Sequence, residues 1–127
     1  MPISFNRTIP ILRMFSEEKA REFYVDYLGF KVDWEGRFEE NTPLYMQVSR
    51  GNLVFHLSEH YGDGTPGTAV YVAMQGVREF HEEISAKKYK YYRPSVERTQ
   101  WNTWAMDLLD PFGNKLRFNE RVEQQEG

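Results

Sequence analysis

The sequence predicts an α+β protein made of two βαβββ modules, and a repeat within the chain is the main reason. An apolar run that ends at Met14 is followed by a segment with helical spacing that contains Arg-Glu-Phe at 21–23. A second apolar run ends at Met74 and is followed by Arg-Glu-Phe at 78–80. Both segments then lead into further β-prone stretches. A three-residue match is common by chance, so the shared order of elements carries the prediction of a duplicated unit.

Length and aromatic content give two further indications. The 127 residues fit a single domain, residues 1–127, composed of module 7–60 and module 67–120. Each module leaves one sheet face bare, and the two faces must cover each other or enclose a ligand. Aromatic residues make up 16% of the chain, which favours a cavity lined by rings, although packing among aromatic-rich strands explains the same content.

The first module begins with a predicted strand over 8–14. Ser16 is a favourable N-cap, and Glu17 and Glu18 stand in the first turn, where the helix dipole favours acids. Gly29 suits the end of the helix. Helical spacing relates the apolar positions Ala20, Phe23, Tyr24, Tyr27 and Leu28. Strands are predicted over 30–37, 43–49 and 52–58, the last two joined by a tight turn at Arg50-Gly51.

The second module repeats this order after a linker. The segment 59–67 contains three Gly and one Pro, a composition typical of a connector. The predicted elements that follow are a strand over 68–74, a helix over 77–88, and strands over 91–97, 103–109 and 115–119. The turn between the last two strands, Asp-Pro-Phe-Gly-Asn at 110–114, has Pro and Gly where a tight reversal needs them.

Composition excludes several classes of function. The net charge is −3 with no basic block, which argues against a nucleic-acid partner. The absence of Cys rules out disulfides, thiol catalysis and Cys-based metal sites. No stretch is apolar enough to span a membrane, and the first residues lack a signal-peptide pattern. We therefore expect a cytoplasmic protein without a membrane partner.

The string at 56–60, His-Leu-Ser-Glu-His, matches the H-x-x-E-H pattern of zinc proteases. That chemistry needs both imidazoles one helical turn apart. Here the segment 52–58 alternates as a strand does, and four residues of strand separate His56 from His60 by about 13 Å. The protease interpretation is therefore rejected.

The alternation of strand residues predicts a polar face on each sheet. His56 falls on the same side as Tyr45 and Gln47 of the preceding strand. Late in the chain, Arg117 alternates with apolar residues. Two half-polar sheets that face each other would form a concave binding surface, while a sheet face that contacts only water is the alternative.

Two tryptophans lie in or beside a polar stretch before the strand at 103–109. Trp101 has polar neighbours, which favours a stacking role toward a ligand, and Trp104 is expected mainly in the core.

Four motifs together resemble the glyoxalase/bleomycin-resistance/dioxygenase superfamily, also called the vicinal-oxygen-chelate fold. They are Leu-Arg-Met at 12–14, Phe-Tyr at 23–24, Leu-Gly-Phe at 28–30 and Asp-Pro-Phe-Gly-Asn at 110–114. The resemblance covers about residues 7–120 and implies two βαβββ modules arranged as a cup-shaped mixed sheet. Trp101 precedes the last motif as it does in bleomycin-resistance proteins, the most similar branch, whose members are dimers that sequester the antibiotic unaltered in clefts between subunits.

The resemblance also implies where metal ligands would lie. Metal-dependent members carry one His, Gln or Glu on each of four strands, and the corresponding positions here are Ile9, His56, Ala69 and Arg117. One donor in four cannot hold a divalent ion, because zinc, iron and nickel sites need at least three. We therefore expect no metal, no cofactor and neither glyoxalase-type isomerisation nor ring-cleaving dioxygenation.

The leading hypothesis is a non-catalytic homodimer that binds a bleomycin-like antibiotic or another small molecule and confers resistance by sequestration. The expected ligand-binding residues are Trp101, His56, Tyr45, Gln47 and Arg117, with no catalytic residue. The alternative is a metal-independent lyase or isomerase, with His56 as base and Arg117 as oxyanion partner. A purely structural or regulatory dimer is a third possibility.

Charge bears on the choice of ligand. His56 and Arg117 would suit an anionic or neutral ligand better than a cationic drug. Acidic residues would reverse this preference if they edge the cleft, and the candidates are Asp33, Glu35, Glu39 and Glu40.

Overall fold

The computed structural model describes residues 2–89 and 93–122 and contains two βαβββ modules. The first module comprises β1 (Ile11–Arg13), α1 (Glu17–Ala20) continuing into the π-helix η1 (Arg21–Tyr27), β2 (Lys31–Gly36), β3 (Tyr45–Arg50) and β4 (Leu53–Ser58). The second comprises β5 (Ala69–Ala73), α2 (Val77–Ser85), β6 (Glu97–Arg98), β7 (Thr103–Leu109) and β8 (Lys115–Arg121). The α+β class and the paired modules predicted from the repeat are confirmed.

The two modules share one sheet topology. The strand order is β1-β4-β3-β2 in the first sheet and β5-β8-β7-β6 in the second. The first strand of each module runs parallel to its last, and the remaining neighbours are antiparallel. Beyond each first strand the same backbone bond recurs, from Met14 N to Ser58 O and from Met74 N to Asn119 O, both 2.9 Å. The duplication therefore extends to individual backbone contacts.

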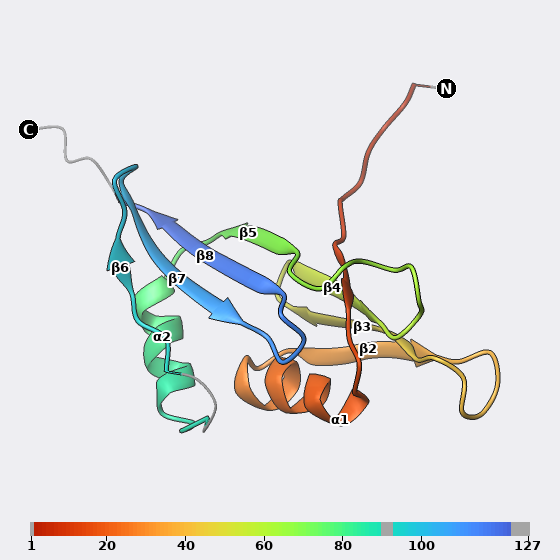
Figure 1. The fold of residues 1–127 in the computed structure, drawn as a ribbon. Helices are drawn as coiled ribbons and strands as arrows, with labels where there is room; N and C mark the ends of the chain where they lie inside the picture. The colour runs from red at the N-terminus through yellow and green to blue at the C-terminus, as the bar shows by residue number, and fades with distance from the viewer. Residues whose placement is uncertain (1, 90–92, 123–127) are drawn as a thin grey trace, which may run out of the picture.

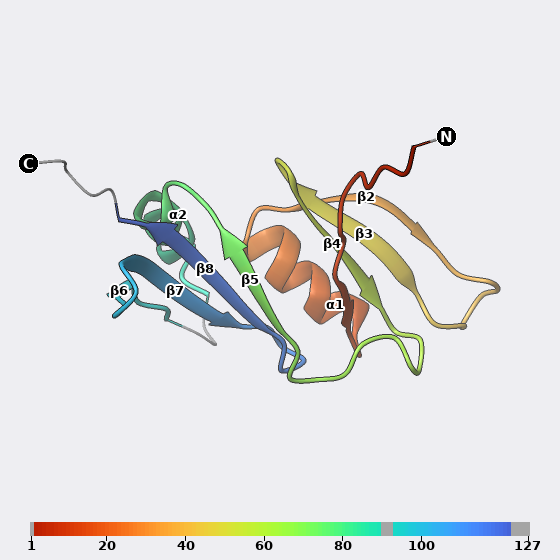
Figure 2. The same cartoon turned by 90° about the horizontal axis from the view of Figure 1, so that it is seen from above.

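The helical segments of both modules lie on the same side of the two sheets, and the other side is covered by neither (Figures 1 and 2). In the first module the residues facing the helix form part of one continuous apolar core. Fully buried side chains of this core include Phe23, Tyr24, Met46, Phe55, Leu57, Met106 and Phe118. Because strand side chains alternate, the residues between these positions point to the helix-free faces. None of the helices in the described ranges is both long and apolar enough to cross a membrane.

Local sequence explains the first helical segment. The Ser16 side chain accepts a hydrogen bond from Lys19 N, as predicted for an N-cap. Gly29, which follows it, has a φ of 79°, a conformation that glycine adopts without strain. Between them the chain widens into a π-helix, in which Leu28 N donates to Phe23 O. The sequence predicted the extent of this helix and its buried face but not its wider pitch.

Two boundaries of the second module differ from the prediction. The helix expected over 77–88 ends at Ser85, and Lys88 has a positive φ of 54° that no α-helix accommodates. Of the strand expected over 91–97, the structure contains only β6, at its end, while residues 90–92 lie outside the described ranges.

One carboxyl group joins the two modules. Asp110 is 3% exposed and accepts hydrogen bonds from Tyr24 Oη (2.6 Å), Phe112 N (2.8 Å), Asn114 N (2.8 Å) and Asn114 Nδ2 (2.8 Å). Asn114 Nδ2 also donates to Arg13 O (2.9 Å). Burial and then the charge of Asp110 hold the pKa of Tyr24 well above its usual value, so its hydroxyl is a donor. We call this group the Asp110 clasp.

Replacement of Tyr24 by Phe should lower the free energy of unfolding by about 1–3 kcal/mol, because a buried acceptor loses a donor and no water replaces it. Tyr61→Phe is the matched control, since Tyr61 is 98% exposed and should change stability by less than about 0.5 kcal/mol. Urea denaturation of both variants measures the difference. Equal stability of the two would mean that the clasp contributes nothing.

Candidate functional site

A polar and aromatic row crosses the helix-free face of the first sheet. Strand pairing places Trp34 of β2 opposite Gln47 of β3, Gln47 opposite His56 of β4, and His56 opposite Ile11 of β1. Tyr45 lies two residues before Gln47 and therefore shares its face. The structure thus brings together three residues that the sequence analysis proposed as ligand contacts, namely Tyr45, Gln47 and His56.

Hydrogen bonds fix the protonation pattern of this row. Gln47 Nε2 donates to Asp33 Oδ2 (2.9 Å), so the amide oxygen of Gln47 faces His56 Nε2 (2.9 Å). An amide oxygen only accepts, hence Nε2 of His56 carries the hydrogen. His56 Nδ1 is then an acceptor and receives the hydroxyl of Tyr45 (2.6 Å). Both imidazole nitrogens are engaged, and we call the four residues the His56 network.

Three titratable groups of the network have shifted pKa values: those of His56 and Asp33 are lowered, and that of Tyr45 is raised. Burial lowers the pKa of His56, which favours the neutral ring. Burial, and secondarily the charge of Asp63, raises the pKa of Tyr45 and keeps its hydroxyl protonated. Hydrogen bonds from Gln47 and then Ser49 lower the pKa of Asp33. At neutral pH the network therefore carries one negative charge, on Asp33.

A β-bulge in β2 brings two adjacent residues to the same face. The pairing passes from Val32↔Val48 to Trp34↔Gln47, so Asp33 is an extra residue in β2. Its carboxylate reaches Gln47 on the helix-free side, beside the indole of Trp34. Asp33 is consequently one of the acidic residues that do border the candidate site.

The other acidic residues proposed to edge the cleft lie elsewhere. Glu35 forms an ion pair with Arg21 of η1, on the helix side of the sheet. Glu39 lies in the β2–β3 loop, where its backbone pairs with Thr42, and Glu40 is exposed in the same loop. Glu35 therefore does not meet the condition of bordering the face, because β2 resumes its alternation after the bulge with Glu35 on the opposite side.

An open hollow of about 580 Å³ adjoins the His56 network. Tyr45 belongs to both, and its ring stacks on that of Trp34 with centroids 5.9 Å apart. The hollow, called here the aromatic hollow, is lined by Trp34, Gly36, Arg37, Phe38, Tyr45, His60, Tyr61 and Asp63. Sequence reasoning had not proposed Trp34, Phe38 or Tyr61, which are 46%, 89% and 98% exposed. The signal available in the sequence was their position, because each of these aromatic residues lies within two residues of a glycine.

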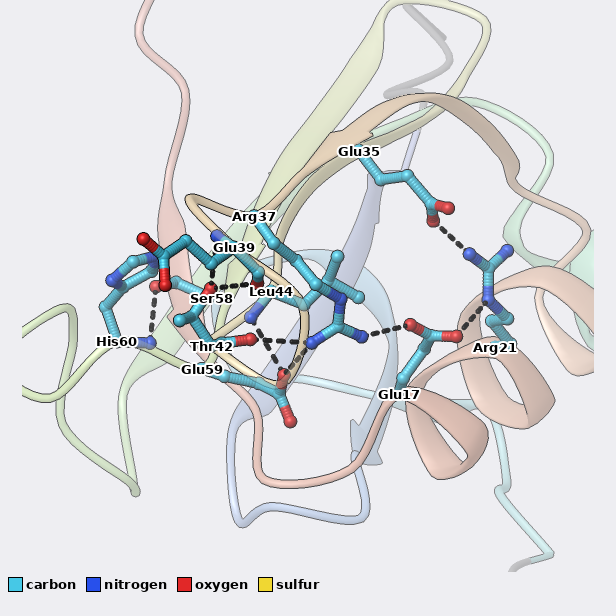
Figure 3. Close-up of polar contacts among 10 residues, drawn as sticks. All are labelled: Glu17, Arg21, Glu35, Arg37, Glu39, Thr42, Leu44, Ser58, Glu59 and His60. Atoms are coloured by element: carbon cyan, nitrogen blue, oxygen red, sulfur yellow. Dashed lines mark hydrogen bonds and ion pairs between the residues drawn. The ribbon is translucent and has the colours of Figure 1, made fainter.

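A chain of ion pairs holds the β2–β3 loop, which carries Phe38, against the helix (Figure 3). Arg37 contacts Glu17 at 2.9 Å and Glu59 at 3.8 Å. Glu17 also contacts Arg21 at 3.5 Å, and Arg21 pairs in turn with Glu35. Cations and anions alternate along this series of ion pairs. The series links α1, η1 and β2 with the β2–β3 loop and with the segment that follows β4, which contains Glu59.

The remaining two proposed contacts belong to the second module. Arg117 lies on the helix-free face of the second sheet, between Tyr71 of β5 and Asp107 of β7. Trp101 lies in the turn before β7 and is 68% exposed. Within the described parts of the chain, no hydrogen bond or ring contact joins either residue to the His56 network.

Trp104 is only partly buried, which modifies its expected place in the core. Its ring packs against the core from the edge and lies beneath the guanidinium of Arg78, 4.0 Å from the ring centroid. Arg98 lies 5.5 Å from the same centroid. Two cations therefore cover this indole, leaving less of its surface for a ligand.

The residues near His56 do not form a metal site. The β1 neighbour of His56 is Ile11, and the β5 neighbour of Arg117 is Tyr71. Ile9 and Ala69, which the resemblance placed at ligand positions, precede these by two residues and have no donor side chain. No cluster of three or more His, Cys, Asp or Glu residues occurs over 2–89 and 93–122. Both nitrogens of His56 are also occupied, so the donor set does not fit a divalent ion.

Comparisons with known proteins agree with this architecture. A family model described as glyoxalase superfamily protein matches residues 1–125. A comparison with curated proteins found no significant match.

Solved structures resemble the chain over most of its length. A bleomycin-binding protein complexed with bleomycin is 20% identical and has a TM-score of 0.72, covering 92% of this chain and 99% of its own. The bleomycin-binding protein of Streptomyces verticillus, complexed with copper(II)-bleomycin, is 23% identical, with a TM-score of 0.70 and coverage of 97% and 100%. A glyoxalase-related enzyme from Clostridium phytofermentans is 15% identical, with a TM-score of 0.73 and coverage of 94% and 98%. At these identities the similarity establishes the fold.

The His56 network predicts a specific titration. NMR should show His56 as the Nε2–H tautomer, with a pKa below the ordinary value near 6.5. As the pH falls, His56 is therefore protonated in the unfolded chain before it is protonated in the folded protein. The free energy of unfolding should therefore decrease below about pH 6.5, until folded His56 is protonated as well. Tyr45→Phe removes the donor to neutral Nδ1 and should raise the His56 pKa toward 6.5. A wild-type midpoint above 6.5 would contradict the assignment.

Proposed function

The chain belongs to the glyoxalase superfamily, and we propose that it is a non-catalytic small-molecule-binding protein that acts by sequestration. The observation that carries this proposal is the complete engagement of His56. Its two ring nitrogens are hydrogen-bonded to Tyr45 and Gln47, so His56 is not free to act as a base. A fixed, satisfied polar row beside exposed rings is suited to holding a ligand rather than to transferring protons.

The ligand proposed is cationic and contains a flat ring, as a bleomycin-like antibiotic does. His56 is neutral in the network, and Asp33 adds a carboxylate to the first face, where Lys31 lies 3.8 Å from it. On the second face, Arg117 stands opposite Asp107. The objection that His56 and Arg117 disfavour a cation is thereby weakened. The exposed indole of Trp34 offers a stacking surface, and cations bind well over such rings.

The five proposed ligand contacts divide between the two sheets. Tyr45, Gln47 and His56 lie on the helix-free face of the first sheet, and Arg117 lies on that of the second. Both faces open on the same side of one chain (Figure 2). A homodimer in which the first face of one chain covers the second face of its partner would enclose a ligand between them and add Trp101 at the rim.

The alternative is a metal-independent lyase or isomerase with His56 as base. This mechanism requires His56 Nδ1 to release the Tyr45 hydroxyl at 2.6 Å and to bind substrate instead. Arg117 would also have to approach from the second sheet. We therefore rank it below sequestration.

A cytoplasmic location also remains a prediction.

Titration with bleomycin tests the ligand. Wild-type protein should show saturable quenching of tryptophan fluorescence at micromolar concentration, with the drug recovered unchanged by mass spectrometry. Trp34→Ala and Trp101→Ala should each weaken binding by roughly tenfold, about 1.4 kcal/mol, as expected for loss of one stacked ring. Phe15→Ala is the control, since Phe15 is 57% exposed but lies outside both faces. Absence of binding would exclude this drug, and recovery of a cleaved or rearranged product would favour the enzyme.

The subunit arrangement has its own test. Light scattering at micromolar concentration should give twice the 15.1 kDa mass of one chain. Apolar side chains on the helix-free faces, including Ile11 at 43% and Leu109 at 47% exposure, would be covered in such a dimer. Arg117→Glu places a second acid opposite Asp107 and should shift the equilibrium toward the monomer. A wild-type mass of a single chain would reject the shared cleft while leaving binding by the aromatic hollow open.

A further inference from the structure

A second pocket, distinct from the aromatic hollow, lies where the two modules meet at α2. Its volume is about 460 Å³, within the range of small-molecule sites. The first module contributes Phe30, Arg50, Asn52 and Leu53, and the second contributes residues 72–76, Glu79, Phe80, Glu83 and Phe118. No residue lines both this intermodule pocket and the aromatic hollow.

The interior of the intermodule pocket is apolar and aromatic. Phe30 and Phe118 are nearly fully buried at 3% and 1% exposure, and Phe80 is 9% exposed. Leu53 of β4 and Val72 of β5 form half-buried walls from opposite modules. A ring-sized apolar group entering here would contact side chains of both sheets and displace water from them.

The rim of the intermodule pocket carries an excess of negative charge. Its single cation, Arg50, is held by both carboxylate oxygens of Glu83 (2.6 and 2.9 Å) and by Leu28 O (2.8 Å). Arg50 also lies over the ring of Phe80, 5.0 Å from its centroid. Glu79 has no hydrogen-bond or ion-pair partner in the described part of the chain. The open charge at this rim is therefore a carboxylate.

Two amides at the start of α2 are not free to bind an anion. The amides of Gly76 and Val77 both donate to the Glu120 carboxylate of β8, at 3.0 and 2.9 Å. Such amides otherwise attract phosphates and carboxylates at a helix N-terminus. Because the protein's own carboxylate occupies these two amides, they do not favour an acidic ligand in the pocket.

We propose that the intermodule pocket is a second binding site, for a small hydrophobic amine. The ring of the amine occupies the apolar interior between Leu53 and Val72, and its ammonium group lies at the rim beside Glu79. Because the walls come from both modules, such a ligand holds the first sheet and α2 together. This site is independent of the function proposed for the sheet faces.

Three matched probes test the proposal: 2-phenylethylamine, neutral 2-phenylethanol and anionic 3-phenylpropionate. The amine should raise the melting temperature saturably and bind several-fold more tightly than the alcohol, and the acid should not bind. Amide NMR shifts caused by the amine in wild-type protein should centre on residues 72–80. Val72→Trp should abolish amine binding by filling the interior, with circular dichroism confirming its fold, and Leu53→Trp gives the same test from the opposite wall.

Two further variants separate this site from the others. Glu79→Gln should reduce the preference for amine over alcohol up to about fivefold, the effect of an exposed ion pair. Trp34→Ala, in the aromatic hollow, should bind the amine as wild type does. Three results would overturn the proposal: no saturable binding of the amine, equal binding of the acid, or loss of amine binding in Trp34→Ala.

Discussion

Four hydrogen-bond donors converge on the buried carboxyl of Asp110, and this group connects the two modules. Three of the donors belong to its own turn, the backbone amides of Phe112 and Asn114 and the Asn114 side chain, and they shape the reversal between β7 and β8. The hydroxyl of Tyr24 arrives from the helix of the other module. Asn114 extends the contact to the backbone of Arg13 at the end of β1. A buried carboxyl is tolerated only when its oxygens are satisfied in this way.

The Asp110 clasp also gives a physical meaning to motifs that are distant in sequence. Arg13 belongs to the Leu-Arg-Met motif, Tyr24 to the Phe-Tyr pair, and Asp110 and Asn114 to the last turn. In space they form one hydrogen-bonded cluster. With the clasp in place, both helical segments lie on one side of the sheets, and the opposite faces are available for other roles (Figure 1).

The fold was largely predictable from sequence because its signals are periodic and local. Alternation in 52–58 placed His56 on the same side as Gln47 of the preceding strand, and the strand pairing confirms that position. The aromatic hollow was not predictable, because it depends on the extra residue Asp33 in β2, which shifts the alternation of all later residues of that strand by one. Nor does sequence periodicity reveal that Glu120 occupies the amides at the start of α2, a contact between segments far apart in the chain.

The duplication has a consequence for how this protein can change. Equivalent positions of the two modules hold different side chains, Ile11 and Tyr71 on the first strands and His56 and Arg117 on the last. These residues point away from the Asp110 clasp and from the shared apolar core. Selection can therefore remodel one face while the other face and the scaffold stay intact. The residues of the helix-free faces and those of the clasp and core are separate sets, a division that allows the faces to change without loss of the folded state.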